Sequence, residues 1–182
     1  MARTRTTYPN FDDLLFAWRK HLESGAPPEN CAGWKTRNGY ICDCGEVIYS
    51  YGKHYPLARC IQAEDSGEQV YIVNATGYSR TTEKHIRETL NRLRPSVGYL
   101  DGSRRDLAAQ TIPPNSASEW VRSLLSAARK DRAQANRRRD SQRREWDIRS
   151  AEKHETDART LAGWLGVSWL VALESSTACA EV

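Results

Sequence analysis

An arginine-rich segment is the part of this 182-residue sequence whose residue types point most directly to a chemical role. Between Arg129 and Arg149 there are nine arginine and lysine residues against four aspartate and glutamate residues, so this segment carries all of the excess positive charge of a chain whose net charge is +4. Cationic side chains at this density bind the phosphates of nucleic acids without reading sequence. The candidate contact residues are Arg129, Lys130, Arg132, Arg137, Arg138, Arg139, Arg143 and Arg144.

The same segment has a second interpretation. A helix through it spreads positive charge around its circumference, because successive residues turn by about 100°. In one interpretation this helix contacts phosphates while Trp120 and Trp146 stack on bases. In the other it is a solvated surface helix, whose arginines pair with carboxylates such as Asp131, Asp140 and Glu145 at three- and four-residue offsets. The sequence leaves both interpretations open.

A second polar group stands where a helix is expected to begin, and its residue types suit an anion such as a phosphate. Hydroxyls, cations and unpaired backbone N–H groups converge at such a helix start. The residues are Ser79, Arg80, Thr81, Thr82, Lys84 and His85. The alternative is that Ser79 or Thr81 only caps the helix, as hydroxyls before a helix commonly do.

Two histidines raise the question of catalysis. His54 and His85 would form a general acid and base, with Ser79 or Thr82 as nucleophile, if the fold brought them together. The sequence has no Gly-x-Ser-x-Gly elbow and no phosphate-cradling glycine-rich loop. We therefore assign no catalytic residue and expect a protein that is not an enzyme.

Four cysteines are candidate ligands of a zinc ion. They are Cys31, Cys42, Cys44 and Cys60, and four thiolates suit one tetrahedral zinc ion, with His54 as a substitute for one of them. The paired Cys-x2-Cys knuckles of common zinc modules are absent, so the alternative is four small apolar side chains in a sheet.

The elements that must position these residues begin with a helix capped by Asn10, whose apolar residues recur at helical spacing: Phe11, Leu14, Leu15, Trp18 and Leu22. Four β-rich runs then predict a three- or four-stranded antiparallel meander, at 40–42, 47–51, 57–61 and 70–73. A second helix is expected from Thr81 to about Arg94, stopped by Pro95. The fold class is therefore α+β, a small antiparallel sheet with packed helices.

The rest of the chain is expected to be helical. Residues 96–115 have linker composition, which divides the chain into a compact module at 1–95, a linker at 96–115 and a helical arm or hairpin at 116–182. A long basic helix should start near Ser116 or Ser118 and continue to about Arg149. A C-terminal helix at 157–173 then folds back, and its thirteen apolar-rich residues from Leu161 are too few to cross a membrane.

Two motifs between residues 45 and 90 resemble a known domain. Residues 51–58 read Tyr-Gly-x-His-x-Pro-x-Ala, and residues 78–85 read Tyr-Ser-x-Thr-Thr-x-Lys-His, with Asn74 between them. This pattern resembles a small domain of unknown function found in bacteriophage and mobile-element proteins. That family has no established activity, so the resemblance implies a phage- or plasmid-type accessory protein with a binding or inhibitory role.

These observations favour an accessory protein of phage or mobile-element type that binds nucleic acid or a nucleoprotein target. An odd cysteine count and a polar segment from Met1 to Tyr8 predict a reducing compartment, the cytoplasm of the host cell, with no membrane partner. One alternative is an inhibitor or assembly factor that docks on a host or phage protein, or forms a homo-oligomer, through its C-terminal helix with Leu161, Trp164, Leu165 and Trp169. The other is a small enzyme acting on a phosphorylated or nucleotide substrate.

Overall fold

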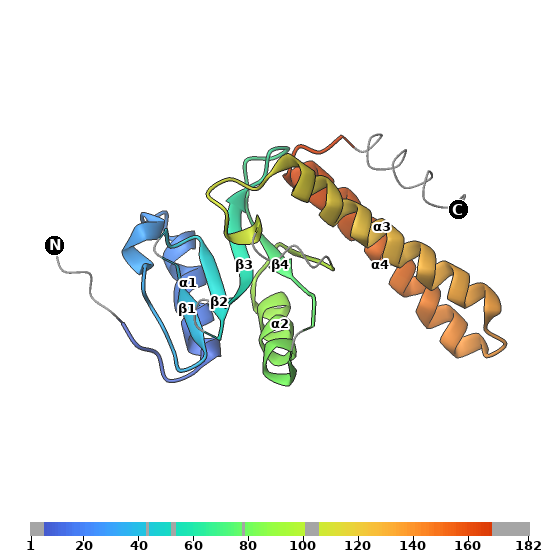
Figure 1. Cartoon of the computed structure of the whole chain (residues 1–182), viewed down its shortest axis with the longest axis horizontal. Helices are drawn as coiled ribbons and strands as arrows, with labels where there is room; N and C mark the ends of the chain where they lie inside the picture. Colours follow the sequence, from blue (N-terminus) through green and yellow to red (C-terminus); the bar gives the residue numbers. More distant parts are fainter. Residues whose placement is uncertain (1–5, 43, 52–53, 78, 101–105, 169–182) are drawn as a thin grey trace.

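The computed structural model describes residues 6–42, 44–51, 54–77, 79–100 and 106–168, and it shows an α+β fold (Figure 1). The five strands of its sheet are β1 (Gly39–Ile41), β2 (Val47–Ser50), β3 (Tyr55–Gln62), β4 (Gln69–Asn74) and β5 (Ser96–Tyr99). The helices are α1 (Phe11–Glu23), α2 (Arg80–Arg92), α3 (Pro114–Arg137) and α4 (Ser141–Trp164), with short 3-10 helices η1 (Pro28–Cys31) and η2 (Asp106–Ala108).

The first helix and the meander form as the sequence predicts. The Asn10 side chain accepts a hydrogen bond from the backbone N–H of Asp13 at 2.9 Å, and this cap starts α1. All five residues of its predicted apolar stripe are buried. Strands β1 to β4 pair in sequence order, each antiparallel to the next. These predictions are confirmed.

The sheet is mixed because it includes a fifth strand that the sequence analysis placed in a linker. Strand β5 pairs in parallel with β4, with Tyr71 opposite Ser96 and Asn74 opposite Tyr99. Parallel strands need a crossover connection, and α2 supplies it. The predicted linker at 96–115 therefore contributes to the sheet, and it also contains η2.

Strand β4 shows how the sheet separates two hydrophobic cores. Its Tyr71 and Val73 pack in the core that includes α1, whereas Val70 and Ile72 pack in the core that includes α3 and α4. Successive side chains of a strand point to opposite faces, so this alternation buries both faces of β4. The second core joins the base of the α3–α4 hairpin to the sheet, from which the rest of the hairpin extends (Figure 1).

The basic segment is divided between two helices, although the sequence analysis predicted one long helix. Helix α3 ends at Arg137, and Arg138 has extended backbone angles of φ −76° and ψ 131°. The Asp140 side chain then caps α4 by accepting from the N–H of Arg143 at 2.8 Å. The chain therefore folds back inside the arginine run, because Asp140 and Ser141 provide a helix start there.

Helices α3 and α4 have 24 residues each, but no helix within the described ranges is both long and apolar enough to cross a membrane.

Candidate nucleic-acid interface

The outer half of the α3–α4 hairpin is held together by small side chains. Ala128 and Ala135 of α3 are buried, as are Ala151 and Ala158 of α4. Each pair is seven residues apart, close to two helical turns, so each pair lies on one face of its helix. Alanine allows the two helices to approach closely. The polar groups buried between them include the side chain of Asp147 and the facing Oδ2 atom of Asp131 and Nδ1 atom of His154, which lie 3.2 Å apart.

Ion pairs across the hairpin neutralise some of the predicted contact residues. Arg132 donates two hydrogen bonds to the carboxylate of Glu155, at 2.8 and 2.9 Å, and this guanidinium lowers the pKa of Glu155. Arg138 lies 3.2 Å from the buried carboxylate of Asp147. These two arginines behave as the surface-helix interpretation predicts, but their partners lie on the other helix.

The remaining positive charge is concentrated near the end of the hairpin. Five of the predicted contact residues are exposed and form no ion pair with any carboxylate in the described ranges, namely Lys130, Arg137, Arg139, Arg143 and Arg144. The last four lie where α3 ends and α4 begins, so the reversal of the chain brings them to one end of the molecule (Figure 1). We call residues 137–146 the hairpin tip.

Lys130 extends this charge along α3. It lies seven residues before Arg137, so both side chains project from the same side of the helix. Ala128 and Ala135 mark the opposite side, which is buried where α3 packs on α4. The axial separation of the two cations is about 10 Å, from a rise of about 1.5 Å per residue. The basic surface therefore continues from the hairpin tip along the outside of α3.

Two of the tip arginines occupy positions that do not favour helix stability. Arg143 and Arg144 lie in the first turn of α4, which contains no acidic residue. A positive charge there opposes the helix dipole, at a cost of about 0.3–1 kcal/mol per charge when exposed. Residues that lower the stability of a local structure without a structural benefit are typical of functional sites.

An aromatic side chain stands beside these arginines. Trp146 is 69% exposed, the largest exposure among the large hydrophobic residues of the described chain. It lies three residues from both Arg143 and Arg149, within one turn of α4. Trp120, which the sequence analysis considered for the same role, is fully buried and stacks on Tyr99 with a ring separation of 4.3 Å. Only Trp146 of this pair can meet a ligand.

The predicted anion site at the start of α2 is used mainly for capping. The Ser79 hydroxyl accepts from the N–H of Thr82 at 3.2 Å and lies 3.1 Å from its hydroxyl. Thr82 is buried, the Tyr51 hydroxyl bonds to the side chains of Thr81 and Ser79, and Lys84 lies 3.6 Å from Glu88. The capping alternative describes this helix start. Arg80 is exposed beside it.

His85 adds no positive charge to that helix start. Its ring is buried and stacks on Phe11 at 3.9 Å, and burial lowers its pKa to about 4, so it is neutral at pH 7. Its Nδ1 atom lies 2.8 Å from the Oγ atom of Ser50, which is itself fully buried. His54 is exposed in the turn before β3. The structure pairs His85 with Ser50, a partner that sequence reasoning missed, because the two residues are 35 positions apart.

The four cysteines do not form the predicted zinc site. Within the described ranges, which include all four, no group of three or more histidine, cysteine, aspartate or glutamate side chains is placed to hold a metal ion. Cys31 and Cys60 are buried in the first core, and burial raises the pKa of each thiol to about 12. These two behave as the small apolar side chains of the alternative interpretation.

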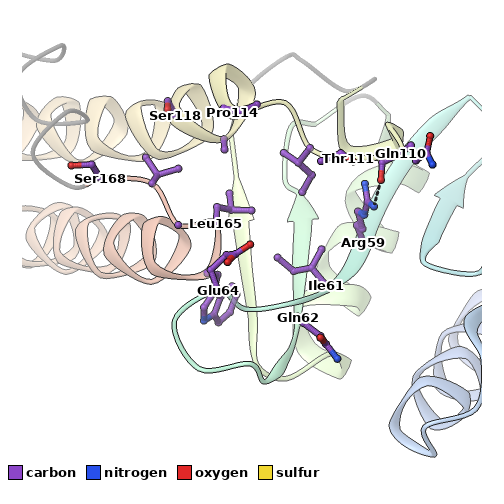
Figure 2. A pocket seen from close by; sticks show the side chains of 15 residues that line it. Arg59, Ile61, Gln62, Glu64, Gln110, Thr111, Pro114, Ser118, Leu165 and Ser168 are labelled. Atoms are coloured by element: carbon purple, nitrogen blue, oxygen red, sulfur yellow. Dashed lines mark hydrogen bonds between the residues drawn. The ribbon is translucent and has the colours of Figure 1, made fainter.

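The apolar C-terminal residues mostly belong to the second core. Leu161 and Trp164 are buried there, so they are not free to dock on a partner, and Trp169 lies outside the described residues. Leu165 is half-buried and lines a cavity of about 570 Å³ with Ile61 (Figure 2).

Arg59, at the edge of this cavity, has a structural role. Its guanidinium donates to the backbone oxygen of Gln110 at 3.0 Å, and this bond is drawn in Figure 2. It also donates to the carboxylate of Glu46 at 3.1 Å. Arg59 is 7% exposed, and these bonds tie β3 to the segment that leads into α3. The guanidinium of Arg59 is therefore already engaged and does not offer a free charge to a ligand in the cavity.

Comparison of the chain with protein-family models, with curated proteins and with solved structures found no match. Of the surfaces described above, the hairpin tip combines unpaired positive charge with an exposed aromatic ring.

Proposed function

We propose that this protein binds nucleic acid through the hairpin tip, mainly by contacts to phosphates and with little dependence on sequence. The observation that supports this most strongly is the group of five exposed cations with no carboxylate partner in the described ranges, next to the exposed ring of Trp146. Arginine and lysine at this density supply the electrostatic part of binding, and an exposed indole supplies stacking on bases.

The dimensions of the hairpin favour single-stranded nucleic acid over duplex. Two packed helices are about 20 Å wide, because each is about 10–12 Å across and their axes lie about 8–10 Å apart. The major groove of B-DNA is only about 12 Å wide, which admits one helix. The hairpin therefore meets a duplex only at its phosphates. An unpaired base, in contrast, presents a free face on which Trp146 stacks.

The biological setting belongs to the same proposal. We further propose that the protein serves a phage or mobile element in the host cytoplasm, the role expected from the motif pattern of residues 45–90. Nucleic acid that is being copied or transferred exposes single-stranded segments, which are the ligand that the hairpin tip suits best. A nucleoprotein target with exposed single strands fits equally.

A binding assay with the full chain tests this proposal. Fluorescence anisotropy with labelled single-stranded and duplex oligonucleotides of equal length should show binding that weakens steeply as salt is raised. The single strand should bind more tightly than the duplex at every salt concentration. Absence of binding to either form, or an affinity that does not change with salt, would remove the proposal. If the duplex bound more tightly than the single strand, the phosphate contacts would remain supported, but stacking of bases on Trp146 would be rejected.

A further inference from the structure

Two cysteines that the zinc hypothesis left unexplained lie together at the turn between β1 and β2. The backbone N–H of Cys42 donates to the carbonyl of Val47 at 2.9 Å, and that of Gly45 donates to the carbonyl of Cys42 at 3.0 Å. Inside this turn, the side chains of Cys42 and Cys44 are hydrogen-bonded to each other. The Sγ atom of Cys42 also accepts from the N–H of Val47 at 3.3 Å. The two thiols therefore form a pair.

The turn that holds this pair is anchored to the protein core. Gly45 has a φ of +78°, and a Cβ atom there would lie 1.7 Å from the carbonyl oxygen of Pro28, so only glycine fits. The Gly45 carbonyl accepts a hydrogen bond from the indole N–H of the buried Trp18 at 2.7 Å. A turn fixed at this point, closed by the hydrogen bond from the Gly45 N–H to the Cys42 carbonyl, keeps Cys42 and Cys44 close together.

The two thiols differ in exposure and acidity. Cys44 is exposed, and the hydrogen bond from Cys42 lowers its pKa to about 6, whereas the same bond together with burial raises the pKa of Cys42. Partial burial and the charge of Glu46 raise the pKa of Cys44, whereas a hydrogen bond from the Glu46 backbone and the charge of Arg59 lower it. The lowered pKa favours the thiolate form of Cys44 at pH 7. A solvent-accessible thiolate beside a protonated thiol matches the division of roles in thiol–disulfide exchange.

We propose that Cys42 and Cys44 form a redox-active pair that exchanges with disulfides, with Cys44 as the attacking thiolate and Cys42 as the resolving thiol. The Cys44 thiolate attacks one sulfur of a low-molecular-weight disulfide, forms a mixed disulfide and releases one thiolate. Cys42 loses its proton to solvent, and its thiolate attacks the Cys44 sulfur and releases the second thiolate. The two cysteines lose two electrons to become a disulfide, and the small disulfide is reduced to two thiols.

The spacing of the two residues allows this bond and keeps it reversible. A disulfide requires Cα atoms about 4.4–6.8 Å apart, and residues two apart in a chain cannot be separated by more than about 7.2 Å. A bond across one intervening residue closes a small, strained ring. Strained and exposed disulfides are the ones that are easily reduced.

Peptide mapping of the full protein tests this proposal. Trypsin cleaves after Arg37 and Lys53, and the resulting peptide contains Cys42 and Cys44 and no other cysteine. After equilibration in glutathione buffers of increasing disulfide content, this peptide should lose two hydrogen atoms of mass and regain them when reductant is added. Cys31 and Cys60 lie in other tryptic peptides and are buried, so they serve as internal controls that stay reduced.

Variants at the exposed turn separate the two roles. Cys42→Ala should trap a glutathione adduct on Cys44, and Cys44→Ala should form neither adduct nor disulfide. The pH midpoint for alkylation of Cys44 should lie near 6 in the wild type and rise in Cys42→Ala, because the donor to the thiolate is gone. A 38–53 peptide that stays fully reduced, or a wild-type glutathione adduct that never resolves, would overturn the proposal. An unchanged alkylation midpoint in Cys42→Ala would overturn the assignment of roles.

Discussion

Replacing Arg143 and Arg144 with glutamine tests the hairpin tip directly. Both side chains are exposed in the first turn of α4, and the structure shows no ion pair for either one in the described part of the chain. Glutamine keeps the length and helix propensity of the side chain while removing its charge. Because both charges oppose the helix dipole, the free energy of unfolding of the double variant should equal or slightly exceed that of the wild type. Weaker binding is then not explained by unfolding.

The expected change follows from the number of cations. If each of the five unpaired cations contacts one phosphate, the logarithm of the affinity for single strands falls with the logarithm of salt concentration with a slope of about −3.5, from about 0.7 per contact. Three contacts remain in the double variant, which gives a slope of about −2.1. Between about 50 and 200 mM salt, the wild type should therefore weaken about 130-fold and the double variant about 20-fold.

The assay is fluorescence anisotropy with a labelled oligothymidylate over a salt series. The matched control is the double substitution Arg87→Gln with Arg94→Gln, which removes the same charge from exposed residues of α2 and the segment after it. The control should keep the wild-type slope. If the control and the tip variant had equal slopes, net charge and not the hairpin tip would determine binding. A wild-type slope in the tip variant would refute the reasoning.

Three further predictions concern single residues. Trp146→Ala should weaken binding to a single strand by about 5- to 150-fold, from about 1–3 kcal/mol of stacking, and should leave the free energy of unfolding in urea within about 0.5 kcal/mol of the wild type because the ring is exposed. Ala151→Leu should lower thermal stability by about 1–3 kcal/mol, because the added atoms separate α3 from α4, whereas Glu152→Leu next to it should not. His85→Gln should remove one source of acid sensitivity: burial lowers the folded-state pKa of His85 to about 4, so its contribution to stability is complete above about pH 6.5 and is lost as pH falls toward 4. Between about pH 7.5 and 4.5 the wild type should lose about 2.5 kcal/mol more than the variant in urea titrations.

Each of these predictions has an opposite result that would count against its premise. An equal affinity in Trp146→Ala would show that the exposed indole does not stack on bases. A stable Ala151→Leu variant would show that the helices of the hairpin are not closely packed at that position. Parallel pH profiles for the wild type and His85→Gln would show that His85 titrates normally in the folded protein.

Local sequence patterns determined a large part of this protein. Helix α1 and strands β1 to β4 form where apolar periodicity, turn residues and the Asn10 cap placed them, because those signals act within a few residues. The concentration of cations between Arg129 and Arg149 was also visible from composition alone. Five of the eight predicted contact residues are exposed without an ion pair in the described part of the chain.

Tertiary structure decided how those residues are used. Strand β5 forms because β4 offers a parallel partner across α2, which four residues of ordinary composition do not reveal. Arg132 is neutralised by Glu155, 23 positions away, so no three- or four-residue offset predicts the pair. Trp120 is buried against the sheet, whereas Trp146 lies on the part of the hairpin that extends beyond it. Spacing along the chain specifies local structure, but charge pairing and exposure depend on partners that only folding brings together.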